Sequence, residues 1–264
     1  MTQRCALITG GTSGLGEAIA RRLHDAGCTV LVTHYAGAGS ADAWLKEQAD
    51  AGYTFKVYDV DVADYDSCQA AAERIIADGH QVDILVNNAG ITRDGTFRKL
   101  GKEKWDAVLR TNLDSMYNMT KPFIDGMTER GWGRVVNISS VNGTKGQFGQ
   151  TNYSAAKAGI QGFTKALAQE VARKGVTVNA VSPGYVATAM VAAVDPEILE
   201  KQIVSQIPMA AWASPKRLPP WSASWPATTP PTLPAPTCRS TAACTCIEAL
   251  RRGRLGVWNP EIFP

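Results

Sequence analysis

The sequence is poor in long apolar runs, in charge and in histidine. None of its 264 residues fall in an apolar run of the roughly 18 residues that a membrane-spanning helix needs. The start, MTQRCALITG, lacks the basic segment and apolar core of a secretory signal, so we expect a cytoplasmic protein. Three histidines and six dispersed cysteines give no zinc-ligand spacing, and we expect no metal site.

Glycine and proline are scarce in opposite parts of the chain. Ten of the 14 prolines lie from Pro215 onward, whereas only two of the 24 glycines lie beyond residue 209. Residues 1–209 hold 21 Lys and Arg against 22 Asp and Glu, and the last 55 residues hold 6 against 2. The slightly acidic body argues against a nucleic-acid surface. We predict one domain over residues 1–209 and a separate tail over 210–264.

Short apolar runs alternate with segments of helical periodicity. Strands are expected at 4–9, 29–33, 54–60, 82–86, 133–138 and 176–181, with helices at 15–26, 41–51, 65–78, 102–127 and 153–174. This alternation predicts an α/β fold, a Rossmann-type doubly wound parallel sheet in a single domain with helices on both faces. The strands are nearly all apolar, as expected when both faces are covered.

The segment TGGTSGLG, residues 9–16, lies between the first expected strand and the first expected helix. Gly10, Gly14 and Gly16 would allow a tight turn and bring backbone N–H groups close to a phosphate. The N-terminus of the following helix would then face a pyrophosphate. An ordinary glycine-rich turn is the alternative, but the position between strand and helix favours a dinucleotide site.

Three other strand ends bear on a cofactor. The second strand ends at residues 33–35 without a carboxylate that would repel a 2′-phosphate, which favours NADP(H) over NAD(H), although no arginine stands nearby to hold that phosphate. His34 there is either a contact for a phosphate or a solvent-facing strand end. The motif NNAG, residues 87–90, is either a cofactor contact or a simple turn. Asp61 and Val62, after the third strand, either hold an adenine or cap a helix.

A serine, a tyrosine and a lysine follow the fifth strand. Ser140 closes the motif NISS, and Tyr153 and Lys157 are spaced i and i+4 on one helical face. A nearby ammonium lowers the pKa of a tyrosine from about 10, which prepares the phenol to give up a proton. A surface Tyr–Lys pair is the alternative, and the combination with the nucleotide motifs outweighs it.

The motifs TGGTSGLG, NNAG, TNL, NISS, YSAAK and PGYVAT make residues 1–209 resemble the short-chain dehydrogenase/reductase family. The resemblance implies that Ser140, Tyr153 and Lys157 are catalytic and that Asn112 holds a proton-relay water. It also implies that NADP(H) is bound by Gly10, Thr12, Ser13, Gly14, Gly16, Asp61, Val62, Asn87, Asn88, Ala89, Gly90, Pro183, Gly184 and Thr188.

Further segments, ITRD, DGMTERGWGRVVNISSVNG and KGQFGQTNYS, resemble the branch of that family that reduces acetoacetyl-CoA with NADPH in polyhydroxybutyrate synthesis. Reduction of 3-oxoacyl thioesters of acyl carrier protein is the alternative activity. The family resemblance also implies a homotetramer. The resemblance to this branch implies an acyl-CoA site lined by Asp94, Gln147, Phe148, Gln150 and Tyr185.

Residues 210–264 fit neither this family nor the apolar periodicity of the body. Where the family continues with a GRLGxPE turn, a helix and a last strand, this chain reads AAWASPKRLPPWSASWPATTPP. A linker rich in proline and alanine is one interpretation. A shifted reading frame is the other, because loss of one base after the Met209 codon turns ATGGGCCGCCTGGGCAAGCCC into codons for MAAWASP.

Restoring that base decodes the tail as GRLGKPEAIAALV and later TGADLSINGGLHM. The same frame permits a stop at the position of Glu248. We therefore predict that the tail lacks the closing helix and strand, which puts the tetramer in doubt. A catalytically silent or misfolded product that binds cofactor is thus a further alternative.

Overall fold

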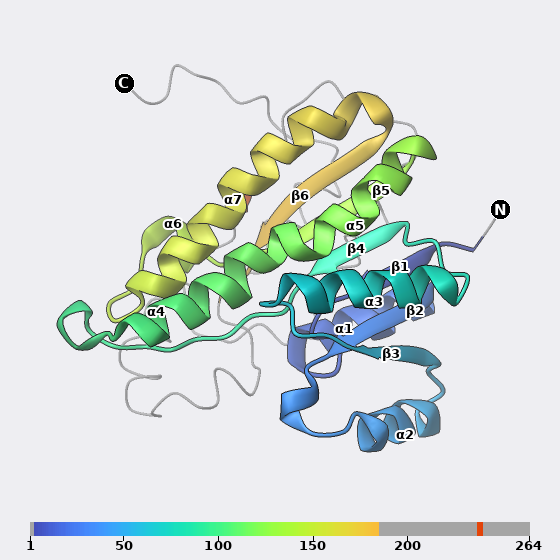
Figure 1. The fold of residues 1–264 in the computed structure, drawn as a ribbon, viewed down its shortest axis with the longest axis horizontal. Coiled ribbons are helices and arrows are strands. Elements are labelled where there is room, and N and C mark those ends of the chain that lie inside the picture. Colours follow the sequence, from blue (N-terminus) through green and yellow to red (C-terminus); the bar gives the residue numbers. More distant parts are fainter. Residues whose placement is uncertain (1–2, 185–236, 240–264) are drawn as a thin grey trace.

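A seven-stranded parallel sheet forms the centre of the protein in a computed structural model that describes residues 3–184 and 237–239 (Figure 1). Neighbouring strands follow the order β3-β2-β1-β4-β5-β6-β7. The first six strands have the doubly wound topology that the sequence predicts. The strands are β1 (Cys5–Ile8), β2 (Thr29–His34), β3 (Phe55–Asp59), β4 (Ile84–Asn87), β5 (Gly133–Ile138), β6 (Val176–Ser182) and β7 (Thr237–Arg239).

Alternate residues of each strand pack on opposite faces of the sheet. In β1, Leu7 joins a core with three helices that lie over one face, and Ile8 joins a core with the first helix on the other. The three helices run across the sheet together in Figure 1. They are α3 (Tyr65–Ala77), α5 (Ser115–Glu129) and α7 (Thr151–Val171), and the opposite face carries α1 (Gly14–Asp25), with α2 (Asp42–Asp50) beside it.

The expected helix at 102–127 is divided. It consists of α4 (Lys102–Leu109), a π-helical turn η3 (Arg110–Asp114) and α5. A π turn inserts one residue into the helical repeat without ending the apolar pattern, so periodicity alone reads the three pieces as one helix. The structure also adds a short helix α6 (Asn142–Lys145) and three 3-10 turns, η1 (Ala36–Ala38), η2 (Phe97–Lys99) and η4 (Ala172–Lys174).

The seventh strand differs from expectation, because the tail was expected to supply none. Thr237 to Arg239 pair in parallel with residues 180–182 of β6. These three residues include no proline, and an edge strand needs a partner on one side only, so the short pairing is permitted. The rest of the tail lies outside the described residues. Within the part of the chain that the structure describes, no helix is long and apolar enough to cross a membrane.

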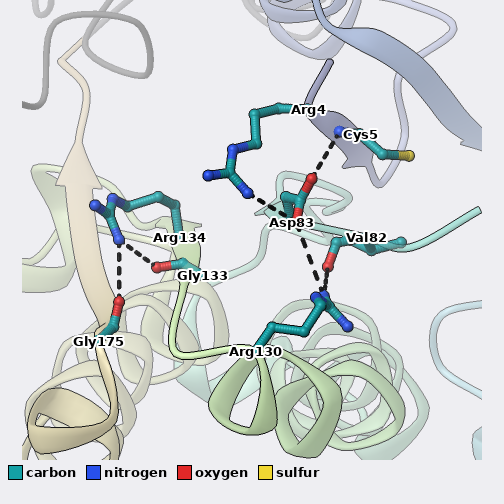
Figure 2. Close-up of polar contacts among 8 residues, drawn as sticks. All are labelled: Arg4, Cys5, Val82, Asp83, Arg130, Gly133, Arg134 and Gly175. Atoms are coloured by element: carbon teal, nitrogen blue, oxygen red, sulfur yellow. Dashed lines mark hydrogen bonds and ion pairs between the residues drawn. The ribbon is translucent and has the colours of Figure 1, made fainter. Parts of the chain in front are cut away.

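A buried carboxylate joins three elements at the amino ends of the strands (Figure 2). Asp83, which is 8% exposed, accepts hydrogen bonds from the Cys5 N–H at 3.1 Å and from Arg4 Nη1 at 3.5 Å. Arg130, at the end of α5, lies 3.9 Å from the same carboxylate and donates to the Val82 carbonyl. Asp83 therefore ties β1, the entry to β4 and α5 together.

Replacing this carboxylate should destabilise the fold. Asp83→Asn keeps the shape but removes the charge that two arginines face, so we expect the free energy of unfolding in urea to fall by about 1–3 kcal/mol. Asp50→Asn is the matched control, because its pair with Lys46 is exposed and should contribute no more than about 0.5 kcal/mol. Equal effects of the two substitutions would contradict the role of Asp83.

Candidate active site

Most of the predicted site residues that the structure describes lie where β1, β4, β5 and β6 end. The glycine-rich turn follows β1, the NNAG motif begins at the end of β4, and Ser140 follows β5. The chain turns in opposite directions along the sheet from β1 and β4, and such a switch point is where open α/β sheets bind ligands. Pro183 and Gly184 follow β6, and the Pro183 carbonyl accepts a hydrogen bond from the Val141 N–H.

The glycine-rich turn has the geometry of a phosphate cradle. Gly10 and Gly14 have φ values of +60° and +54°, a region that favours glycine. A Cβ on Gly16 would lie 2.2 Å from the Gly10 carbonyl oxygen. Ser13 precedes α1 without capping it through its side chain, so the first-turn N–H groups lack that partner. These features fit a dinucleotide pyrophosphate at the helix N-terminus.

Hydrogen bonds join the NNAG segment to the glycine-rich turn. The Thr9 hydroxyl oxygen accepts from the N–H groups of Asn88 at 2.9 Å and Ala89 at 3.0 Å. In return, Asn88 Nδ2 donates to the carbonyls of Thr9 and Gly10 at 2.9 and 3.2 Å. The two segments are thus held in fixed register. Sequence reasoning missed Thr9, although a threonine directly before the first glycine was the available signal.

Asn87 lies in the core, on the side of the sheet covered by α5 and α7. It is 1% exposed, and its Nδ2 donates to Thr120 Oγ1 at 3.0 Å and to Asn137 Oδ1 at 2.9 Å. Asn137 in turn donates to Thr164 Oγ1 at 2.9 Å. This buried chain connects β4 and β5 to the two helices directly beneath the site.

His34 occupies the end of β2 with both ring nitrogens engaged. Its Nε2 lies 2.8 Å from the Gly39 carbonyl, and its Nδ1 lies 3.1 Å from the Thr12 hydroxyl. Because a carbonyl can only accept, Nε2 carries the proton, and in the neutral ring Nδ1 accepts from Thr12. His34 is therefore more than a solvent-facing strand end, since it links the glycine-rich turn to the loop after β2.

Asp61 and Val62 follow β3 and are held by local contacts. Asp61 Oδ1 accepts from the Ala63 N–H at 2.9 Å, which forms a side-chain turn. Val62 is buried, and its carbonyl accepts from Asn118 Nδ2 at 3.0 Å. A pocket of about 450 Å³ lies beside this segment between α3 and α5. None of the predicted site residues lines this pocket. The residues that line it are Ala63, Tyr65, Arg110, Asp114, Tyr117 and Asn118.

Lys157 is a buried ammonium beside the ring of Tyr153. Lys157 is only 4% exposed, and its Nζ lies 5.5 Å from the Tyr153 ring centroid. Nζ donates to the Ile138 carbonyl at 2.8 Å, its one hydrogen bond to the described residues. Burial lowers the pKa of Lys157 from 10.5 to about 8. The remaining N–H groups fit the ribose hydroxyls of a nucleotide.

Two hydrogen bonds hold the serines that follow β5, one to α7 and one to α6. Ser139 Oγ donates to the Lys157 carbonyl at 2.7 Å. Ser140, 9% exposed, accepts at Oγ from the Asn142 N–H at 3.2 Å. Because that contact uses an acceptor site of the Ser140 oxygen, the hydroxyl proton stays available for donation.

Asn112 is fully buried within the π turn. Its Oδ1 accepts from the Ile91 N–H at 2.7 Å, and its Nδ2 donates to the Ile91 carbonyl at 2.9 Å. Gly90 lies between this amide and the ammonium, since a Cβ there would be 2.9 Å from Asn112 Oδ1 and 3.6 Å from Lys157 Nζ. The π turn thus holds the residue that follows the NNAG segment, close to the Lys157 ammonium.

Two of the predicted substrate residues contact each other. Gln150 Nε2 donates to Asp94 Oδ2 at 2.9 Å, and Gln150 Oε1 accepts from Asn142 Nδ2 at 3.0 Å. Two further predicted substrate residues precede Gln150 in the sequence. Phe148 is 86% exposed, and Gln147 is half-buried. Sequence reasoning missed Asn142. Tyr185 and Thr188 lie outside the described residues.

A sheet with these nucleotide and Ser–Tyr–Lys elements defines a Rossmann-type oxidoreductase site, and comparison with known proteins agrees. A family model described as short chain dehydrogenase matches residues 4–198. The chain therefore belongs to the short-chain dehydrogenase family, whose members use NAD(P)H.

Several curated relatives are similar over most of their length. An acetoacetyl-CoA reductase of Cupriavidus necator is 53% identical over 218 residues, 83% of this chain and 88% of the relative. Nodulation protein G of Azospirillum brasilense is 52% identical with the same coverage of both chains. The 3-oxoacyl-(acyl-carrier-protein) reductase FabG of Haemophilus influenzae is 43% identical over 192 residues, 72% of this chain and 77% of the relative.

Filling the space at Gly16 should weaken nucleotide binding. Gly16→Ala places a methyl group against the Gly10 carbonyl, so we expect NADPH to bind at least tenfold more weakly, which is roughly 1.4 kcal/mol. Gly162→Ala is the matched control, because a Cβ at this exposed position of α7 meets no atom within 4 Å. Fluorescence titration measures both. Unchanged affinity in Gly16→Ala would place the pyrophosphate elsewhere.

Proposed function

We propose that the protein reduces acetoacetyl-CoA to 3-hydroxybutyryl-CoA with NADPH, as a step of polyhydroxybutyrate synthesis. The observation that carries the proposal is the buried Lys157 ammonium beside the Tyr153 ring, at the end of β5. The substrate is inferred from the relatives named acetoacetyl-CoA reductase, which share about half of their residues with this chain. The family itself supports only the coarser statement of an NAD(P)H-dependent oxidoreductase.

In this proposal, Tyr153 gives its phenolic proton to the ketone oxygen. The Ser140 hydroxyl donates a hydrogen bond to the same oxygen, since its own oxygen already accepts from Asn142. The Lys157 ammonium favours the phenolate that remains when the proton leaves. NADPH, when bound, supplies the hydride for the 3-keto carbon.

The cofactor would be held along the ends of four strands. The turn that includes Gly10 and Gly16 would hold the pyrophosphate, Asp61 and Val62 the adenine end, and Lys157 the ribose. The remaining contacts would come from the other predicted cofactor residues, Thr12, Ser13, Gly14, Asn88, Ala89, Gly90, Pro183, Gly184 and Thr188, whereas the buried Asn87 would support the nicotinamide side from within the core. A preference for NADPH is inferred from His34, which stands at the end of β2 where a carboxylate would repel a 2′-phosphate.

Asn112 would hold the proton-relay water, a role taken from the family resemblance. Its two hydrogen bonds to the Ile91 backbone would keep the residue in place for this role. Gln147 would contact the amide-rich arm of the acyl-CoA, and the exposed Phe148 would cover it. Tyr185 is retained as a substrate residue from the resemblance alone.

Substrate and cofactor are tested together in one assay. We expect a higher kcat/KM with acetoacetyl-CoA than with the matching acyl-carrier-protein thioester, and a higher kcat/KM with NADPH than with NADH. A preference for the carrier-protein thioester would instead support the alternative function that the FabG relative suggests. An equal or higher kcat/KM with NADH would contradict the NADPH preference inferred from the end of β2, where His34 stands in place of a carboxylate.

Removing the phenolic proton should stop catalysis without disturbing the cofactor. Tyr153→Phe keeps the ring and loses the acid, so we expect the reduction rate to fall by at least about a hundredfold while NADPH affinity is kept. Tyr117→Phe, on the exposed side of α5, is the control and should keep the parent rate. If Tyr153→Phe retained a tenth of that rate, another group would be the proton donor.

We also propose that residues 210–264 arise from the loss of one base after the Met209 codon. The family model ends at residue 198, and the Cupriavidus necator alignment leaves part of both chains unmatched, which supports a tail foreign to the family. Sequencing the coding DNA around that codon tests the origin of the tail directly.

Restoring the base should raise the activity of the protein and allow it to form a tetramer. A chain that continues as GRLGKPE would follow the family sequence to its end, so we expect it to be tetrameric and at least tenfold more active than the present chain. Size-exclusion chromatography and the reductase assay measure this in parallel. Equal activity and equal size of the two chains would mean that the tail does not impair the enzyme.

A further inference from the structure

We propose that Asp94, Gln150 and Asn142 form a hydrogen-bonded strap that positions Ser140 and the start of α7. Gln150 then acts as a positioning residue and not as a contact for the acyl-CoA. The strap itself is a feature of the fold, and its effect on catalysis rests on the proposed function.

Charge fixes the orientation of the Gln150 amide. The Asp94 carboxylate can only accept, so it draws the NH2 group of Gln150, at 2.9 Å. The carbonyl oxygen of Gln150 is thereby left for the NH2 group of Asn142, at 3.0 Å. Both ends of this amide are engaged within the protein before any substrate binds.

The strap ends at the catalytic serine. Asn142 is 6% exposed at the start of α6, and its backbone N–H donates to Ser140 Oγ at 3.2 Å. One residue therefore receives the strap through its side chain and holds the Ser140 oxygen through its backbone. A displacement of Asn142 would shift the hydrogen bond that the Ser140 oxygen accepts. The direction in which the Ser140 hydroxyl proton points would then change.

Gln150 is also the residue that begins α7. It stands at the N-cap, its carbonyl accepts from the Ser154 N–H at 2.8 Å, and its side chain makes no capping bond. Ser, Thr, Asp and Asn are the residues that usually cap a helix with their side chains, and glutamine is not one of them. Here the side chain reaches to other loops instead, three residues before Tyr153.

Neighbouring contacts hold the same two segments together. The Gly95 N–H donates to the Gly149 carbonyl at 2.9 Å. Asn152, which is fully buried, donates to the Arg93 carbonyl at 3.0 Å and accepts from the Tyr153 N–H at 2.8 Å. The loop at residues 93–95 is thus docked on the first turn of the catalytic helix, and the strap crosses this junction.

Exchanging donor and acceptor across the strap tests the proposal. Gln150→Glu places two carboxylates against each other, whereas Asp94→Asn with Gln150→Glu restores the bond, now donated by residue 94. In the double variant, the second oxygen of residue 150 still accepts from Asn142. Gln169→Glu makes the same change on the exposed part of α7 and serves as the control.

We expect kcat/KM for acetoacetyl-CoA to fall roughly tenfold in Gln150→Glu, since small displacements of catalytic groups are costly. The double variant should return to within about threefold of the parent, and Gln169→Glu should match the parent. If the Gln150 N–H instead contacted the substrate directly, the double variant would stay impaired, because a carboxylate at position 150 cannot donate. A double variant as impaired as Gln150→Glu would therefore overturn the positioning role.

Thermal unfolding tests the strap without any assay of activity. It is measured for the parent, for Asp94→Asn and Gln150→Glu alone, and for the double variant. We expect the loss of melting temperature in Gln150→Glu to be recovered in the double variant. Additive losses would show that the two side chains are uncoupled and would overturn the strap. If the parent failed to reduce acetoacetyl-CoA while this recovery held, the proposed function would be wrong and the strap would stand.

Discussion

The site is organised around one buried positive charge. Removing an ammonium from water is costly, and among the described residues Lys157 offsets that cost with one hydrogen bond to a carbonyl and with its place beside the Tyr153 ring. The charge is held there because α7 is fastened to the end of β5 at both Ser139 and Ile138. The π turn and the NNAG segment meet beside this charge, where a Cβ on Gly90 would lie 2.9 Å from Asn112 Oδ1, so a glycine is needed at that position.

The sheet supplies the rigidity that this arrangement needs. Every strand pair is parallel, and the core residues alternate between two covered faces. The chain of amides through Asn87 and Asn137 replaces apolar packing just below the site, and its hydrogen bonds fix β4 and β5 against α5 and α7. A shift of either strand against these helices would break hydrogen bonds in the buried chain, which is costly where water cannot replace them.

Much of the fold and the outline of the site could be predicted from the sequence, because alternating apolar runs and the glycine-rich turn are local signals. The π turn could not, since the apolar pattern runs through it without a break. Nor could the contact between Gln150 and Asp94, because those residues are 56 positions apart and neither belongs to a periodic pattern. The ties made by His34 and Thr9 likewise depend on loops that only the folded sheet brings together.

The pKa of Lys157 is the most direct test of this account. NMR titration of the 13Cε resonance of lysine, assigned with a Lys157→Arg variant, should give a value of about 8 in the protein without nucleotide. Because the unfolded chain keeps this proton to about pH 10.5, stability should also rise with pH between these two values. A Lys157 pKa of 10 or above would mean that the ammonium is solvated and that the site is not built around a buried charge.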